Sequence, residues 1–206
     1  SLFFSLIFMI DLYDSPVTNV FVGILVSGGF LFSFGQFVPS WDSGYYALMM
    51  TQNVPYKEYL KSKWWLVVVG TLVSIPLASF YIFFSWESYL AIIAGGIYNI
   101  GINAHVVLLS GAYTRTPIDL NSMQRAFGDK KSFNVKTLLL SIPKILLPMF
   151  IFYIGVLVHS KLMGFVLIGI VGILGFALRN LVFGWIEKVY QEEKYDTLAA
   201  YKQKNT

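Results

Sequence analysis

Side chains that could take part in chemistry are few in this sequence, and three of them lie inside an apolar stretch. Asn99 and Asn103 are four residues apart, and His105 follows two residues later. At about 100° per helical residue the two asparagines share a face, whereas His105 points away from them. Two interpretations stay open for Asn99, Asn103 and His105: a polar lining for a substrate path, or hydrogen bonds between packed helices.

The sequence lacks the motifs of nucleotide, metal and nucleophilic chemistry. It has no G-x-x-x-x-G-K-[ST] run, no H-E-x-x-H and no G-x-S-x-G, and its two histidines, His105 and His159, have no carboxylate at ligand spacing. Without cysteine it can form no disulfide and no thiolate-ligated metal site. We therefore expect no catalytic residue, cofactor or metal in this chain, and no enzyme activity of its own.

The composition points to lipid as the surrounding medium of these residues. Of the 206 residues 56% are hydrophobic and only 13% are charged, far below the roughly 25% charged residues of soluble domains. A soluble fold of this size would expose large apolar patches. We expect a single all-α transmembrane domain over 1–206, part of a longer chain, in a membrane of the bacterial inner-membrane type.

Uncharged segments long enough for a helix across the hydrocarbon core set the expected spans. The sequence predicts a polytopic bundle of five full spans, preceded at residues 1–10 by the tail of another helix. The expected spans are 17–34, 64–86, 88–114, 138–158 and 162–184. Lys144 and Arg179 fall inside two of them, and we expect these side chains to extend to the membrane interface rather than form a buried ion pathway.

Positive charges gather in alternate connections between these spans. They concentrate in residues 35–63, 113–137 and 185–206, while the opposite connections hold only Lys161. The positive-inside rule then predicts that these three segments and the C-terminus are cytoplasmic. Topology and contact with membrane lipid account for the net charge of +4, so no nucleic-acid partner is expected.

Residues 35–63, here called the elbow, predict a helix, a break and a second helix. Ser40 or Asp42 can cap the first helix, and the run Asn53-Val54-Pro55 interrupts it before the chain restarts toward the next span. An amphipathic stretch lying in lipid headgroups and a helix that docks on a partner protein both fit this pattern. In 113–137, Asp119 and Gly128 similarly predict the start and end of a small surface helix.

Residues 48–63, which an apolar span follows at once, resemble the first cytoplasmic segment of ABC-2-type transporter permeases. Their sequence is Leu48-Met49-Met50-Thr51-Gln52-Asn53-Val54-Pro55-Tyr56-Lys57-Glu58-Tyr59-Leu60-Lys61-Ser62-Lys63. Two other runs look more particularly like a group of uncharacterised bacterial permease-like proteins. They are Phe34-Gly35-Gln36-Phe37 with Trp41, and Thr116-Pro117-Ile118-Asp119-Leu120-Asn121.

The resemblance implies the permease component of an ABC-type exporter. It implies an ATP-binding cassette subunit as partner, which would hold ATP and Mg, and a second permease half or a second copy of this chain. The elbow would transmit ATP-driven movement through the coupling residues Trp41, Asp42, Tyr45, Leu48, Met49, Pro55, Tyr56, Lys57, Tyr59, Lys61 and Lys63. A membrane scaffold that keeps the permease fold without transport is the alternative.

Overall fold

Apolar helices dominate the structure, a computed structural model that describes residues 16–52, 54–83, 85–117 and 135–202. These residues form helices and connections, with no β-strand among them. By length and composition three helices could cross a membrane, or four if one bent pair forms a single span. The expectation of a helical protein is confirmed for the described residues, and several of its helices are long and apolar enough to span a membrane. The predicted tail at residues 1–10 lies outside the described residues.

The first expected span, 17–34, is a helix interrupted at Gly28. α2 (Pro16–Ser27) ends there and the short α3 (Gly29–Phe34) continues, so α2 alone is shorter than a full span. The short elements η1 (Gly35–Phe37), η2 (Ser40–Asp42) and α4 (Tyr46–Thr51) follow.

The next two spans form a hairpin of long helices. α5 (Tyr56–Leu77) continues through the 3-10 turn η3 (Ser79–Phe83), and α6 (Trp86–Tyr98) runs back through η4 (Asn99–Asn103) into α7 (Ala104–Ala112). The η4 segment is a π-helical turn. Such turns occur mostly as single insertions in α-helices, frequently at functional sites, and this one contains both asparagines that the sequence singles out.

The last three helices correct the expected fifth span. α9 (Val135–Val158) is followed by α10 (Lys161–Ala177) and α11 (Arg179–Lys202), and the chain bends by 65° between α10 and α11. The expected span over 162–184 is therefore not one continuous helix but two helices that meet at this bend. At the bend Arg179 Nη1 donates to the Phe176 carbonyl oxygen at 3.1 Å, and its guanidinium lies 4.5 Å from the Phe176 ring centroid. This side chain caps a carbonyl at the end of α10, where intrahelical donors run out.

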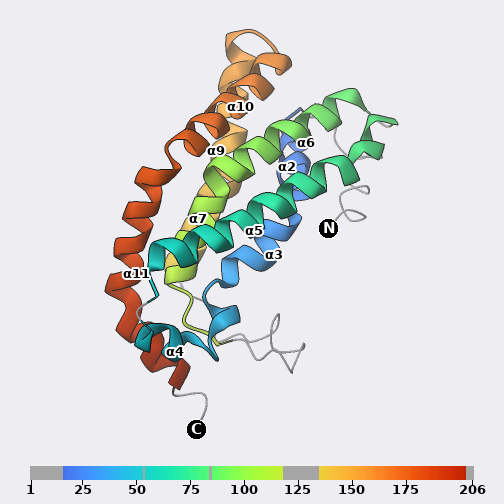
Figure 1. Ribbon diagram of the computed structural model, residues 1–206. Helices are drawn as coiled ribbons and strands as arrows, with labels where there is room; N and C mark the ends of the chain where they lie inside the picture. Colours follow the sequence, from blue (N-terminus) through green and yellow to red (C-terminus); the bar gives the residue numbers. More distant parts are fainter. Residues whose placement is uncertain (1–15, 53, 84, 118–134, 203–206) are drawn as a thin grey trace.

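Helix α6 packs against α2 and α10, and α10 also packs against α9 (Figure 1). Glycines allow these helices to approach closely. Gly23 of α2 faces the backbone of Ala91 in α6, and Gly101 of η4 faces the backbone of Gly172 in α10. A methyl group on Gly172 would lie 2.7 Å from the carbonyl carbon of Ile97. Small residues at crossings bring membrane helices into backbone contact, so these two contacts fix α2 and α10 against the α6–α7 rod.

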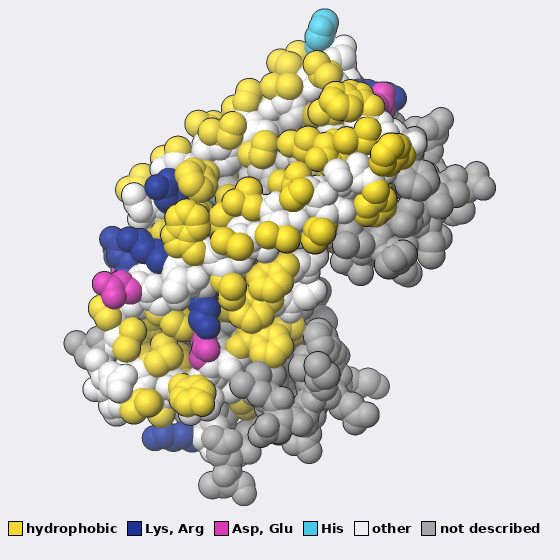
Figure 2. Space-filling model, turned by 45° about the vertical axis from the view of Figure 1, so that its right-hand side comes forward, with side chains coloured by type: hydrophobic (Ala, Val, Ile, Leu, Met, Phe, Trp, Pro, Cys, Tyr) yellow, Lys and Arg dark blue, Asp and Glu magenta, His cyan; other side chains and the backbone are white. Residues whose placement is uncertain are grey.

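The outer surface matches a lipid-facing bundle. One face of the molecule carries a broad field of hydrophobic side chains, with charged side chains toward its edges and its lower part (Figure 2). Large apolar residues are exposed along α5, α9 and α10, among them Val69 of α5, Phe150 of α9 and Ile173 of α10. Patches of this extent on monomeric proteins mark membrane or protein contacts.

The crossing of η4 and α10 yields a stability prediction with an internal control. Gly172→Ala should lower the unfolding free energy by about 1–3 kcal/mol, because the added methyl group overlaps backbone atoms that cannot move aside. Gly169→Ala on the same helix should leave stability unchanged, since no atom lies within 4 Å of that position. Thermal unfolding of both variants in detergent measures the difference. Equal losses in Tm for the two variants would contradict the close contact of α10 with η4.

Candidate functional site

The elbow contains the helix–break–helix arrangement that its sequence predicts. α4 ends at Thr51 and α5 begins at Tyr56, after Pro55 in an extended conformation. The expected cap is wrong: α4 begins at Tyr46 without a side-chain cap, and Ser40 and Asp42 lie in the preceding 3-10 turn.

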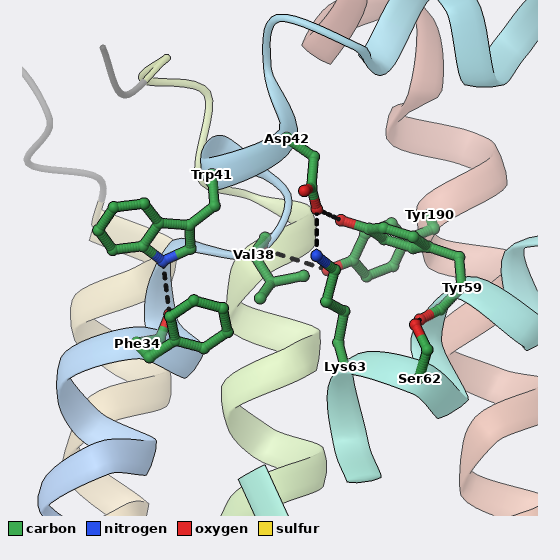
Figure 3. Close-up of polar contacts among 8 residues, drawn as sticks. All are labelled: Phe34, Val38, Trp41, Asp42, Tyr59, Ser62, Lys63 and Tyr190. Carbon is green, nitrogen blue, oxygen red and sulfur yellow. Dashed lines mark hydrogen bonds and ion pairs between the residues drawn. The ribbon is translucent and has the colours of Figure 1, made fainter. Parts of the chain in front are cut away.

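Asp42 instead joins the turn before α4 to the first turns of α5 (Figure 3). Its Oδ2 accepts a hydrogen bond from the Tyr59 hydroxyl at 2.7 Å and forms an ion pair with Lys63 Nζ at 2.7 Å. The Asp42 and Lys63 side chains are 25% and 19% exposed, so water screens this pair less than a surface pair. Charge-assisted hydrogen bonds to a carboxylate are stronger than neutral ones, and here they hold the elbow on α5.

Tyrosines fill the space between α4, α5 and α11. The Tyr46 and Tyr56 hydroxyl oxygens lie 3.1 Å apart, and the Tyr56 hydroxyl donates to Met50 Sδ at 3.2 Å. The Tyr46 ring meets the Tyr201 ring edge-on at 5.4 Å between centroids. Burial raises the pKa of the Tyr46 phenol, which keeps it neutral and able to donate. The buried side of α4 is thus a set of aromatic and hydrogen-bonded contacts to both long helices.

Tyr190 and Trp41 complete the attachment of the elbow (Figure 3). Tyr190 of α11 directs its hydroxyl at the Val38 carbonyl oxygen, 3.3 Å away, and at the Leu108 carbonyl oxygen of α7, 2.9 Å away. Trp41 Nε1 donates to the Phe34 carbonyl oxygen at 3.0 Å. The bonds to Phe34 and Val38 satisfy backbone acceptors where α3 ends and the elbow begins, a place where helical partners are missing.

The predicted coupling residues divide into a buried group and an exposed group. Tyr56 and Tyr59 are each only 8% exposed; they pack in the interior because α5 places them on its inner face, and their coupling role stays a prediction. Lys63 forms an ion pair with Asp42 of the same elbow. The exposed residues are Tyr45, Leu48, Pro55, Lys57 and Lys61, while Trp41, Asp42 and Met49 are partly exposed.

Three residues of this region were not predicted: Tyr46, Tyr190 and Tyr201. All three are buried, at 1%, 2% and 3% exposure. The signal was present in α11, where the buried residues Phe183, Ile186, Tyr190, Thr197 and Tyr201 recur at helical spacing. Acidic and basic residues lie between them, so the sequence of this segment resembles a polar cytoplasmic tail and its buried face is easily missed.

A second polar cluster, here called the asparagine seam, lies inside the bundle. Asn103 Nδ2 donates to Asn99 Oδ1 at 2.7 Å and to the Lys144 carbonyl oxygen of α9 at 3.1 Å. Asn99 Nδ2 donates to Ser27 Oγ at 2.9 Å and to the Ile24 carbonyl oxygen of α2 at 3.0 Å. Both asparagines are fully buried. These bonds join α2, the α6–α7 rod and α9, which is the arrangement that the packing interpretation predicts; a path lining stays a prediction.

His105 is separate from the asparagine seam, as its spacing indicates. Its Nδ1 lies 2.8 Å from the Gly101 carbonyl oxygen, and its ring packs between Trp64 and Phe183 at centroid distances of 5.7 and 5.3 Å. This histidine is a packed core residue in an aromatic cluster. Within the described ranges no group of three His, Asp or Glu side chains could hold a metal ion.

Lys144 is the charged residue nearest to the seam, and its expected extension to the membrane interface is wrong. Its exposure is only 4%, since its backbone is tied to Asn103 in the centre of the bundle. Of the described carboxylates none forms an ion pair with it. Ionisable residues in this situation are rare within membrane spans and face the bundle interior or a cavity.

The segments with positive charge meet at one end of the bundle. Arg115, after α7, bonds Glu193 and Asp196 of α11 through Nη2, at 2.5 and 2.8 Å. The Tyr201 hydroxyl donates to the Thr114 carbonyl oxygen at 3.4 Å. The elbow, the start of 113–137 and the tail of α11 therefore lie together. The small helix predicted between Asp119 and Gly128 lies outside the described residues.

Comparison with known proteins identifies a family but no activity. The profile described as "Family of unknown function (DUF5687)" matches residues 1–204. No curated protein and no solved structure matches the chain.

The Asp42 contacts predict a loss of stability that an exposed ion pair would not give. Asp42→Ala should lower the unfolding free energy by about 1–3 kcal/mol, because the buried Tyr59 hydroxyl loses its acceptor. Glu87→Ala is the control: it breaks the exposed pair with Lys161, whose side chains are 46% and 49% exposed, and should cost about 0–1 kcal/mol. Chemical or thermal unfolding in detergent distinguishes the two. A larger loss in Glu87→Ala would mean that Asp42 does not hold the elbow.

Proposed function

The chain belongs to the DUF5687 family of unknown function, and we propose that it is the membrane-spanning permease component of an ABC-type exporter. A partner subunit would bind ATP and Mg and hydrolyse the nucleotide, and the elbow would carry the resulting movement into the helices. The proposal rests on the sequence resemblance of the elbow and on one feature of its geometry, the different character of the two sides of α4.

That feature carries the proposal. The inner side of α4 contacts α5 and α11 through Tyr46, whose neighbours are Tyr56 and Tyr201. The outer side presents Tyr45 and Leu48, which are 67% and 53% exposed. A short helix with large apolar side chains facing outward suits docking in a groove of a partner. A force on its outer side would reach two long helices through contacts that are already packed.

The charges around α4 suit a protein contact on the cytoplasmic side. Lys57 and Lys61 are exposed on the first turns of α5, beside the docking helix. Basic residues at an interface rim mainly set the orientation and rate of encounter. In the proposed topology five spans cross an inner membrane of the bacterial type, with the broken α2–α3 segment as the first and the bend after α10 close to the cytoplasmic surface. A second permease half, or a second copy of this chain, would complete the transporter.

The proposed topology is testable by labelling, because the chain has no cysteine of its own. Single cysteines at Lys57 and Lys202 should react with a membrane-impermeant thiol reagent from the same side of sealed vesicles. A cysteine at Lys161 should react from the other side, because Lys161 lies across the bundle at the α9–α10 connection. Labelling of positions 57 and 202 from opposite sides would overturn the five-span topology.

If an ATPase docks on α4, substitutions on the outer side of this helix should weaken its binding. Replacing Tyr45 and Leu48 together by Ala should weaken binding of the ATPase in detergent by about 1–4 kcal/mol, the range of hot-spot residues. The control replaces Leu66 and Val69 by Ala; both are exposed on α5, at 44% and 52%, but away from α4. Binding affinity and ATP hydrolysis in the co-purified complex provide the measurements.

Two outcomes would contradict this function. One is a wild-type protein that co-purifies no ATP-hydrolysing subunit from its own membrane. The other is an unchanged affinity after the double substitution in α4. Either result would favour the scaffold alternative, in which the permease fold is kept without transport.

A further inference from the structure

A cavity of about 340 Å³ lies between the elbow and α11, near the lower limit of the roughly 300–1,000 Å³ typical of ligand pockets. The elbow wall is largely apolar and is made by Met49, Met50, Val54, Pro55 and Tyr56. The methionine thioethers can adapt to the shape of a ligand, while the Tyr56 hydroxyl is engaged by Met50 and Tyr46. This wall suits the apolar part of a small molecule.

The opposite wall is a polar stripe on α11. Glu187, Gln191 and Lys194 line the cavity, and their spacing of four and three residues places them on one face of the helix. Seven residues of α-helix rise by about 10 Å. A carboxylate, a carboxamide and an ammonium group therefore follow one another along the wall.

Both charges of this stripe lack a partner of opposite sign. Among the residues that the structure describes, neither Glu187 nor Lys194 takes part in an ion pair, with each other or with a third residue. Lys194 Nζ lies 4.9 Å from the centroid of the Tyr195 ring, a contact that leaves its charge in place. Both residues are partly buried. The cavity thus offers one negative and one positive charge, each available to a ligand.

Two opposite charges in one cavity disfavour a ligand that carries a single charge. A cation beside Glu187 is repelled by Lys194, and an anion beside Lys194 is repelled by Glu187. Because Coulomb energy falls as the inverse of distance, an ion about 4 Å from one charge and about 8 Å from the other loses about half of its attraction to the repulsion. A ligand with an ammonium group at one end and a carboxylate at the other gains both attractions.

We propose that this cavity binds a small zwitterion of extended shape, with its ammonium group beside Glu187 and its carboxylate beside Lys194. A free di- or tripeptide fits these requirements. An extended chain covers about 3.3–3.6 Å per residue, so the termini of such a peptide are about 7–10 Å apart. The Gln191 carboxamide can donate to and accept from a peptide bond between them. The site belongs to this chain alone and does not rest on the presence of an ATPase.

The dipeptide alanyl-leucine and two blocked analogues separate the contributions of its two ends. Acetylation of the amino terminus leaves an anion, and amidation of the carboxyl terminus leaves a cation. Calorimetric titration of the full-length chain in detergent, without any ATPase, measures their affinities. The free dipeptide should bind most tightly, and each analogue should bind about two- to fivefold more weakly, the range expected of partly exposed ion pairs.

Two variants that each remove one charge assign the ends of the ligand. Glu187→Gln should weaken binding of the free dipeptide about two- to fivefold without weakening the acetylated analogue, which has no ammonium group. Lys194→Gln should likewise weaken the free dipeptide and spare the amidated analogue. A structural defect would weaken all three ligands alike. The controls Lys188→Gln and Glu192→Gln change exposed charges of α11 that do not line the cavity, and should bind as the wild type does.

Methionine methyl NMR locates the dipeptide without any substitution. Titration should shift the methyl signals of Met49 and Met50, and leave those of Met149 in α9 and Met163 in α10 unchanged. The proposal is overturned if the free dipeptide does not bind, if either blocked analogue binds as tightly, or if Glu187→Gln weakens the free and acetylated peptides equally. Shifts confined to Met149 and Met163 would overturn it as well.

Discussion

The close approach of η4 to α10 is the contact on which the rest of the bundle depends. Gly101, Gly172 and Gly175 leave no room for a side chain between the two backbones. Lipid offers no hydrophobic drive for helices to associate, so tight packing and interhelical hydrogen bonds must supply the cohesion. Both occur at the same turn, because the π-helical segment that carries Gly101 also carries Asn99 and Asn103. From this turn hydrogen bonds extend to α2 on one side and to α9 on the other.

Lys144 differs from the neighbouring asparagine seam in its contribution to stability. The amides of Asn99 and Asn103 stabilise the packing with bonds of about 0.6 kcal/mol each on average. A buried ammonium without a carboxylate partner costs several kcal/mol, and packing of neighbouring helices does not offset that cost. Asn103 holds Lys144 by its backbone, not by its charge. Stability therefore does not explain why a lysine occupies this place in α9.

The sequence predicts the helices well and their interruptions poorly. Uncharged length sets the spans, and the run ending in Pro55 sets the break in the elbow, because both depend on local chemistry. The π-helical turn packs through a contact between distant segments, the backbone of Gly172 against Gly101, which spacing along the chain does not reveal. The bend at Leu178 has a local contact, the bond from Arg179 to the Phe176 carbonyl oxygen, but no proline or charge run in the sequence marks it. The burial of Tyr56 and Tyr59 was predictable from the sequence, since Tyr56, Tyr59, Leu60 and Trp64 recur at helical spacing. The resemblance to a coupling segment implies a role for both tyrosines but no burial.

The attachment of the elbow determines how a displacement of α4 would spread. Asp42 ties it to α5, while the single hydroxyl proton of Tyr190 is shared between the Val38 and Leu108 carbonyl oxygens. A shift of the elbow away from α11 would lengthen the longer of these two bonds and leave Tyr190 with α7. A shift that carries α11 along would instead strain the contact with α7. Because α7 continues through η4 into α6, the second movement reaches the glycine crossing with α10, and the first stops at α11.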